Sequence, residues 1–208
     1  MQAVIFDLGG VLIDFDFNRA FDAAAQLSGL SKQEIRERLF GGGDFVNYDR
    51  QALHDFEVGR ITGEQFHAWV EQALGARFPY AQFCALWTSI FTRTVDENLA
   101  LIPQLAQRGL KVGILSNTNC IHFDFLRARM AVLRDLEHVY ASHLIQLRKP
   151  AAESFHYVLK KMEAPANASV FIDDFEPNVA AARQAGLHGI VASNPAAVRD
   201  GLAALKLL

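Results

Sequence analysis

The chain has 208 residues, of which 51% are hydrophobic and 21% are charged, and this composition is typical of a globular protein rather than a disordered one. Its 20 Lys and Arg residues are balanced by 23 Asp and Glu residues without any basic block, so the charge gives no reason to expect nucleic acid as a partner. Cys84 and Cys120 lie far apart and outside any C-x-x-C pattern, which argues against a disulfide framework and a cysteine zinc site.

The first segment of the chain lacks the basic region of a signal peptide and meets an acid at Asp7. No apolar run approaches the length of about 18 residues that a membrane span needs. We therefore expect a cytoplasmic protein without a membrane partner.

Residues 3–6 form a continuous apolar run, which predicts a strand that is buried on both faces of a parallel sheet.

Residues 15–94 have a different pattern, in which we find no strand-like run. Ser31 and Thr62 begin capping-box patterns, and apolar residues from Tyr80 to Phe91 recur at helical spacing. These signals predict about four amphipathic helices, which is enough for a small bundle. The glycines at 41–43 lie between two of these helices and lack the Lys-Ser/Thr of a phosphate-binding loop, so we interpret them as a turn.

The remainder of the chain alternates between apolar runs and helical patterns. The runs occupy residues 112–115, 138–143, 169–172 and 189–192, of which 138–143 is the weakest. Strands that alternate with helices indicate an α/β protein with a doubly wound, Rossmann-like parallel sheet. We predict that residues 1–14 and 95–208 form this core, and that residues 15–94 are an all-helical insertion after its first strand.

Polar residues follow four of the predicted strands. They are Asp7, the pair Ser116 and Asn117, Lys149, and the pair Asp173 and Asp174. Because ligands of open α/β sheets bind at the carboxyl ends of the strands, we expect these side chains to converge in one crevice.

The chemistry of this set follows from its charges. Three carboxylates repel one another unless a cation neutralises them, and oxygen ligands suit Mg²⁺, although Mn²⁺ also accepts them. Lys149 adds a positive charge, while Ser116 and Asn117 add neutral donors. The set is therefore suited to an anionic, phosphate-like group, with one carboxylate placed to attack it and form an aspartyl-phosphate.

Four motifs in this order resemble those of the haloacid dehalogenase superfamily of hydrolases over essentially the whole chain. They are FDLGGVL at 6–12, LSN at 115–117, RKP at 148–150, and FIDD at 171–174 followed by Asn178. The helical insertion resembles the cap domain of that superfamily. Residues 14–19 and 116–119 are similar to segments of its sugar phosphatases of the α-D-glucose-1-phosphate phosphatase type.

The resemblance implies a role for each matching residue. Asp7 would be the nucleophile and a metal ligand, and Gly9 would offer its carbonyl to the metal. Lys149 would bridge the nucleophile and the phosphate, with Ser116 and Asn117 binding the phosphoryl group. Asp174 would ligate Mg²⁺, with Asp173 as a second ligand or as a partner behind it.

Gly9 departs from the pattern of most phosphatases of this superfamily, which carry a general acid and base Asp at that position. Loss of general acid catalysis typically costs about 10²–10⁴-fold in rate. Either the leaving group is a good one, as the hemiacetal hydroxyl of a sugar 1-phosphate is, or the proton comes from water, the substrate, Asp14 or Asp16. Otherwise the protein is a weak enzyme or a non-catalytic relative.

We therefore predict a Mg²⁺-dependent phosphatase that acts on a small phosphorylated metabolite such as a hexose 1-phosphate, as a monomer or homodimer. Two alternatives stay open. The first is a metal-independent 2-haloacid dehalogenase, which has no evident use for Asp173 and Asp174. The second is a non-catalytic protein that binds a phosphorylated ligand, which Gly9 suggests. Phe15, Phe45 and Tyr48 are candidates for residues that face the substrate.

Overall fold

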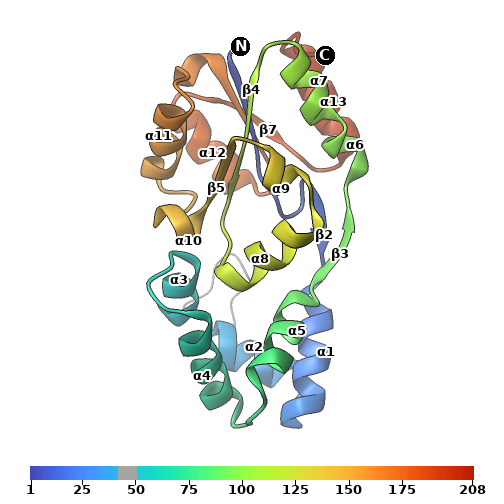
Figure 1. Cartoon of the computed structure of the whole chain (residues 1–208), viewed down its shortest axis with the longest axis vertical. Coiled ribbons are helices and arrows are strands. Elements are labelled where there is room, and N and C mark those ends of the chain that lie inside the picture. Colours follow the sequence, from blue (N-terminus) through green and yellow to red (C-terminus); the bar gives the residue numbers. More distant parts are fainter. Residues whose placement is uncertain (42–50) are drawn as a thin grey trace.

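A computed structural model describes residues 1–41 and 51–208, in which a parallel sheet with its flanking helices lies above a group of helices (Figure 1). The sheet has the order β5-β4-β1-β6-β7 and every neighbouring pair is parallel. Its strands are β1 (Ala3–Phe6), β4 (Lys111–Ser116), β5 (His138–Ala141), β6 (Ser169–Asp173) and β7 (His188–Val191). This architecture confirms the predicted doubly wound α/β fold.

The sheet is buried on both faces because its central strands carry apolar side chains at successive positions. Val4 and Phe6 point to one face, and Ala3 and Ile5 point to the other. The first face packs against α6 (Asp96–Leu99), α7 (Leu101–Gln107), α8 (Cys120–Arg129), α9 (Val132–Asp135) and α13 (Pro195–Ala204). The second face packs against α11 (Ala152–Lys161) and α12 (Glu176–Gln184), and the short elements α10 (Ser142–Ile145) and η1 (Ala166–Ala168) lie in connecting segments.

The helices of the insertion share an apolar core of their own. They are α1 (Phe17–Ser28), α2 (Lys32–Phe40), α3 (Gln51–Glu57), α4 (Gly63–Leu74) and α5 (Tyr80–Thr88). Phe56 and Phe66 stack in this core with ring centroids 4.3 Å apart. The capping boxes at Ser31 and Thr62 are confirmed, since each side chain accepts a hydrogen bond from the third residue of its helix.

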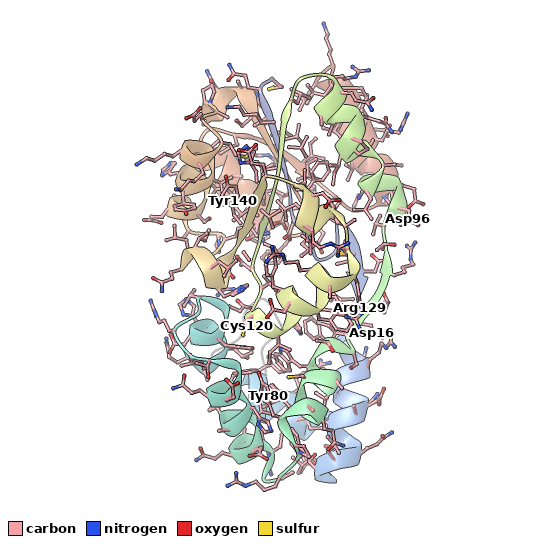
Figure 2. The ribbon with its side chains drawn as sticks, viewed as in Figure 1. Asp16, Tyr80, Asp96, Cys120, Arg129 and Tyr140 are labelled. Carbon is pink, nitrogen blue, oxygen red and sulfur yellow. The ribbon has the colours of Figure 1, made fainter. Side chains whose placement is uncertain are left out.

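Two short strands connect the insertion to the sheet, and the expectation of no strand between residues 15 and 94 is wrong. β2 (Ile13–Phe15) pairs antiparallel with β3 (Phe91–Thr94). The predicted helical stripe ends at Thr88, and Phe91 begins β3 instead. These strands are too short and too exposed to produce a clear alternation of apolar and polar residues. Asp16 lies where β2 leads into α1 and caps that helix (Figure 2).

Two further predictions can be compared with the structure only within residues 1–41 and 51–208. The glycine cluster is described only at Gly41, which ends α2 with a φ of 67°, so the predicted turn at residues 42 and 43 lies outside them. Among the helices of residues 1–41 and 51–208, none combines the length and the apolar character that crossing a membrane requires.

Candidate active site

A cavity of about 220 Å³ lies between the carboxyl ends of the sheet strands and the helices of the insertion. We call its sheet side the floor and the opposite side, formed by β2, β3 and the inserted helices, the wall. The floor includes Asp7, Ser116, Asn117, Lys149 and Asp174. The crevice predicted from the strand ends therefore exists.

Asp7 follows β1 directly and is 9% exposed. Its Oδ1 accepts hydrogen bonds from the main-chain N of Leu8 at 2.7 Å and from Lys149 Nζ at 2.8 Å. Among the residues that the structure describes, Oδ2 has no hydrogen-bond partner. Burial raises the pKa of Asp7 well above its usual value; Lys149 opposes this, and Asp173 and Asp174 add to it. One oxygen is thus oriented, and the other is available for chemistry.

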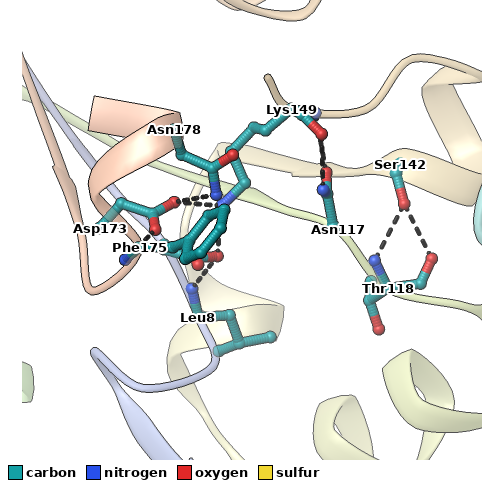
Figure 3. A network of polar contacts seen from close by, with 9 residues as sticks. Leu8, Asn117, Thr118, Ser142, Lys149, Asp173, Phe175 and Asn178 are labelled. Atoms are coloured by element: carbon teal, nitrogen blue, oxygen red, sulfur yellow. Dashed lines mark hydrogen bonds and ion pairs between the residues drawn. The ribbon is translucent and has the colours of Figure 1, made fainter. Parts of the chain in front are cut away.

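Lys149 is 1% exposed, and its ammonium group lies between the carboxylates of Asp7 and Asp173, of which Figure 3 labels Asp173. Nζ is 2.8 Å from Asp7 Oδ1 and 2.6 Å from Asp173 Oδ2, and it lies 5.3 Å from the centroid of the Phe171 ring. Burial lowers the pKa of Lys149, but the attraction of Asp173 and Asp7 outweighs burial and holds the pKa above its usual value. Lys149 is therefore a fixed positive charge beside the carboxylate of Asp7.

Asp173 lies behind Lys149 and does not line the cavity. Its Oδ2 accepts hydrogen bonds from Lys149 and from Asn178 Nδ2 at 3.1 Å, and its Oδ1 accepts one from Phe175 N at 2.8 Å. Three donors thus fix a carboxylate that is fully buried at the end of β6. Of the two roles left open for Asp173, this arrangement favours the partner that orients Lys149.

Asn117 makes a reciprocal pair of hydrogen bonds with the main chain of Lys149 (Figure 3). Its Nδ2 donates to Lys149 O and its Oδ1 accepts from Lys149 N, both at 2.9 Å. Both ends of its side-chain amide are therefore occupied. Asn117 lines the cavity as predicted, but its side chain positions Lys149 instead of extending into open space.

Asp174 completes a cluster in which one oxygen each of Asp7, Asp173 and Asp174 lie within 4.8 Å of one another. Burial and the neighbouring Asp173 raise the pKa of Asp174. Gly10 makes room for this carboxylate, because a Cβ at Gly10 would lie 2.2 Å from Asp174 Oδ2. Three carboxylates beside one ammonium leave a negative excess, and these oxygen ligands fit Mg²⁺.

The remaining predicted residues also line the cavity. Ser116 is the buried last residue of β4, and Gly9 follows the strand end by three positions. Phe15 faces the cavity from β2, whereas Phe45 and Tyr48 lie outside the described residues. Asp173, by contrast, is held just behind the cavity, which is lined by Asp7, Gly9, Ser116, Asn117, Lys149 and Asp174.

The side chains of Asp14 and Asp16, the two predicted alternative proton sources, make contacts outside the cavity. Asp14 Oδ2 is 2.9 Å from Arg93 Nε across the β2–β3 pair, and Asp16 caps α1 by accepting a hydrogen bond from Asn18 N at 2.9 Å. Neither residue is among those that line the cavity. Both act in the described structure as residues of the connection between sheet and insertion.

His122 lines the cavity, but its ring nitrogens are both engaged. Nε2 lies 2.8 Å from the carbonyl of Trp87 and therefore donates to it, while Nδ1 lies 3.2 Å from Asn119 Nδ2. Burial lowers the pKa of His122 to about 4, so the ring is neutral near pH 7. His122 joins α8 to α5 and has no proton directed into the cavity.

Three residues of the junction between sheet and insertion were not anticipated. Arg148 Nη2 is 3.1 Å from Glu57 Oε2. The buried Ser142 Oγ accepts a hydrogen bond from Thr118 N at 2.9 Å and lies 2.8 Å from Thr118 O (Figure 3). The same Oγ lies 2.6 Å from Glu57 O, so its hydroxyl can donate to either carbonyl. Arg148 belongs to the RKP motif and Ser142 lies outside the four motifs, but the sequence gives no signal for these contacts, because only the fold brings the two residues to Glu57.

Residues 1–186 match the family of haloacid dehalogenase-like hydrolases. The chain is 25% identical to a phosphatase of Mycobacterium tuberculosis over 97% of its own length and 92% of the relative. It is 23% identical to the D-ribitol-5-phosphate phosphatase of Bacteroides thetaiotaomicron over 97% of both chains. A solved HAD family enzyme of Bacteroides thetaiotaomicron with magnesium and inorganic phosphate has a TM-score of 0.76 and 26% identity, covering 92% of this chain and 93% of its own.

The chain belongs to the haloacid dehalogenase-like hydrolases. Its fold is shared with the solved enzyme of that family that holds magnesium and inorganic phosphate, and both of these curated relatives are phosphatases.

Proposed function

We propose that this protein is a Mg²⁺-dependent phosphatase that hydrolyses a small phosphorylated metabolite through an aspartyl-phosphate on Asp7. The observation that supports this proposal most directly is the fixed pair of Asp7 and Lys149 beside the cluster of three carboxylates. The relatives that are phosphatases, and the similar structure with magnesium and phosphate, support the same chemistry.

In this reaction Asp7 Oδ2 attacks the phosphorus atom while the ester oxygen departs, and water then hydrolyses the aspartyl-phosphate. Lys149 keeps Asp7 oriented and offsets the charge that develops on the transferring group. Asp173 holds Lys149 in place, and Asn117 fixes its main chain. The Ser116 hydroxyl and the main chain around Asn117 bind the phosphoryl oxygens.

The cation of this proposal is held by Asp7, Asp174 and the carbonyl of Gly9, with Asp173 next to them. When bound, Mg²⁺ supplies positive charge to the phosphoryl oxygens and relieves the repulsion among the carboxylates. In this proposal, residues 1–14 and 95–208 form the core, and residues 15–94 form a cap that covers its cavity.

The proposed substrate is a sugar phosphate, such as a hexose 1-phosphate. The D-ribitol-5-phosphate phosphatase among the relatives acts on a phosphorylated sugar alcohol, which supports a polyhydroxylated substrate. A cavity of about 220 Å³ in the described structure suits a small molecule of this kind.

The test is phosphate release from a panel of sugar phosphates, nucleotides and 4-nitrophenyl phosphate, with Mg²⁺ and with EDTA. We expect turnover that requires Mg²⁺ and that falls by at least about 10³-fold in Asp7→Asn, because the amide is a poor nucleophile. Asp200→Asn removes an exposed acid on α13 and is the matched control.

The outcomes separate the open alternatives. Phosphate binding without any release would contradict the proposal in favour of a non-catalytic protein. Halide release from a 2-haloacid in the presence of EDTA would contradict it in favour of a dehalogenase. The cluster of three carboxylates argues against the second outcome, because attack of Asp7 on carbon makes no use of Asp174.

A further inference from the structure

Two hydroxyl groups on the segment that follows β4 are available to a ligand. Ser116 and Thr118 both line the cavity, and the two residues are only 4% and 6% exposed. Neither hydroxyl makes a hydrogen bond within residues 1–41 and 51–208, although hydroxyl groups of buried residues usually have a partner. Both oxygens are accessible from the cavity and are not sealed in the core.

The other polar side chains of this segment are already engaged. Asn117 makes its two hydrogen bonds with the main chain of Lys149. Asn119 Oδ1 accepts a hydrogen bond from His122 N at 3.0 Å, and Asn119 Nδ2 lies 3.2 Å from His122 Nδ1. The segment thus alternates between hydroxyl groups at the cavity and amide side chains that hold the surrounding structure.

The main chain of Thr118 is fixed on both sides of its side chain. Ser142 Oγ accepts a hydrogen bond from Thr118 N at 2.9 Å and lies 2.8 Å from Thr118 O. Figure 3 shows that the hydroxyl oxygen of Thr118 points away from Ser142. Because a fixed backbone leaves only the choice of rotamer, this hydroxyl is restrained before a ligand arrives, which reduces the entropy lost on binding.

The two hydroxyl groups have different surroundings. Ser116 ends β4, which pairs with β1, and Asp7 follows β1 directly. Thr118 lies two residues farther along the chain, and Ser142, which holds its main chain, also lies 2.6 Å from Glu57 O of the insertion. Thr118 is therefore located where the floor meets the wall. Ser116 is beside the nucleophile, where the phosphoryl group binds, and Thr118 is beside the organic part of the substrate.

We infer that the Thr118 hydroxyl forms a hydrogen bond with a hydroxyl group on the organic part of the substrate and thereby determines which phosphate esters react fastest. This inference rests on the proposed phosphatase function and assigns it a specificity-determining residue. A threonine hydroxyl both donates and accepts, so it can pair with a substrate hydroxyl in either direction. An ester that lacks the hydroxyl forfeits this bond, which slows its reaction relative to that of the hydroxylated ester.

The test compares substrates that differ in their organic part, on the Mg²⁺-loaded protein. Glucose 1-phosphate, glucose 6-phosphate and ribitol 5-phosphate carry free hydroxyl groups, whereas the organic part of 4-nitrophenyl phosphate carries none. Thr118→Val removes the hydroxyl and keeps the branched side chain. We expect the ratio of kcat/KM for the fastest hydroxylated ester to kcat/KM for 4-nitrophenyl phosphate to fall about tenfold in this variant, a typical cost of an unpaired hydrogen-bonding group.

Two further variants are the controls. Thr118→Ser keeps a hydroxyl group and should retain most of the ratio. Ser116→Ala removes the hydroxyl assigned to the phosphoryl group, so it should lower kcat/KM for every ester and change the ratio little. Competitive inhibition by inorganic phosphate separates the two positions again, because Ser116→Ala should weaken it more than Thr118→Val does.

Monodeoxy analogues of the fastest hydroxylated ester identify the substrate hydroxyl concerned. In the unaltered protein, one analogue should react about tenfold more slowly than its parent. In Thr118→Val, the parent and this analogue should react at similar rates, because the partner of that hydroxyl has been removed.

An equal loss for every ester in Thr118→Val would overturn the inference, because Thr118 would then act on the phosphoryl group. The inference also fails if no hydroxylated ester is cleaved, or if every monodeoxy analogue matches its parent in the unaltered protein, a result that does not require a folded variant. In each of these cases, Mg²⁺-dependent cleavage of 4-nitrophenyl phosphate would leave the phosphatase proposal intact. Absence of Mg²⁺-dependent release from every ester would overturn the proposed function, and the inference with it.

Discussion

The floor and the wall of the cavity are built in different ways. Asp7 and Lys149 in the floor, and Asp173 behind them, are held by hydrogen bonds and ion pairs at fixed distances, as the three donors to Asp173 illustrate. The wall is held by ring packing, such as that of Phe15 on Phe17, and by the backbone pairing of β2 with β3. Directional contacts fix the position of an atom, whereas apolar packing fixes only a shape.

The floor and the wall therefore serve different steps, the attack on phosphorus and the recognition of the organic part of the substrate. Attack on phosphorus depends on the position of Asp7 to within a fraction of an ångström, and a polar network is suited to that precision. Contact with the organic part of a substrate depends on the shape of the wall, which a few side-chain exchanges alter. Changes to the floor should therefore reduce turnover of every substrate, whereas changes to the wall should reorder the substrates.

After Asp7→Asn, the substitution Gly10→Ala should have the largest effect. Gly10 has a φ of +72°, and an added Cβ would meet the Asp174 carboxylate at 2.2 Å, so Asp174 must move away from the cluster. We expect Mg²⁺ affinity and turnover to fall by about 10²-fold, as for displaced metal-site partners. Gly29→Ala has the same φ with no atom within 4 Å and is the control; equal losses in both variants, measured by Mg²⁺ titration, would contradict the expectation.

The contact of His122 with Trp87 joins floor and wall, and its effect depends on pH. The pKa of His122 is lowered to about 4, so the unfolded chain binds a proton below about pH 6.5 that the folded protein does not. The free energy of unfolding should thus fall as pH drops from about 6.5 to 4, by at most about 3 kcal/mol from this group. Urea unfolding at several pH values measures this effect. Between pH 6.5 and 4, the free energy of unfolding of His122→Gln should depend less on pH than that of the unaltered protein. The variant His156→Gln, which replaces an exposed histidine, is the control and should not show this change.

Asn117→Ala tests whether the floor acts as a network. The variant loses two hydrogen bonds to the main chain of Lys149 and should lower kcat about tenfold, as a displaced catalytic group does. KM should change little, because the amide holds Lys149 and not the phosphate. A rise in KM at constant kcat would instead support the predicted phosphate contact. Asn194→Ala, which removes a helix cap at α13, controls for general destabilisation.

Ser142→Ala is expected to have the smallest effect. It removes the acceptor of Thr118 N and the contact with Glu57 O, and leaves a buried N–H without its partner. A cost of about 1–2 kcal/mol in the free energy of unfolding follows. Ser154 is equally buried but bonds only Ala151 O at the start of its own helix, so Ser154→Ala should cost less. Equal costs in thermal unfolding would show that the contact between sheet and insertion adds no stability.

The sheet was predictable because its strands are long enough apolar runs to be buried on both faces, as residues 169–172 illustrate. The ends of α2 and α4 were predictable from Ser31 and Thr62, whose capping is a local interaction. The pair of β2 and β3 was not predictable, because its register joins Ile13 with Thr94 and Phe15 with Phe91, which are far apart in the sequence. Three or four residues carry too little periodic signal to reveal such a pairing.

The floor was predictable for a related reason. Strand ends meet at one edge of a parallel sheet, so Asp7, Lys149 and Asp174 could be placed together without knowledge of distances. What remained hidden was the direction of each side chain. That Asn117 faces the Lys149 main chain, or that Phe15 lies beside Gly9, depends on rotamers and on the pairing of β2 with β3.

Two of the bonds that attach the insertion to the sheet run from core side chains to main-chain carbonyls. Ser142 reaches Glu57 O, and His122 reaches Trp87 O. Every amino acid provides such a carbonyl, so the identity of the inserted residue is not needed for the attachment. Side chains of the insertion can therefore be replaced while both hydrogen bonds to its main-chain carbonyls are kept. Substitutions that reshape the cavity wall therefore need not break these two contacts between the insertion and the core.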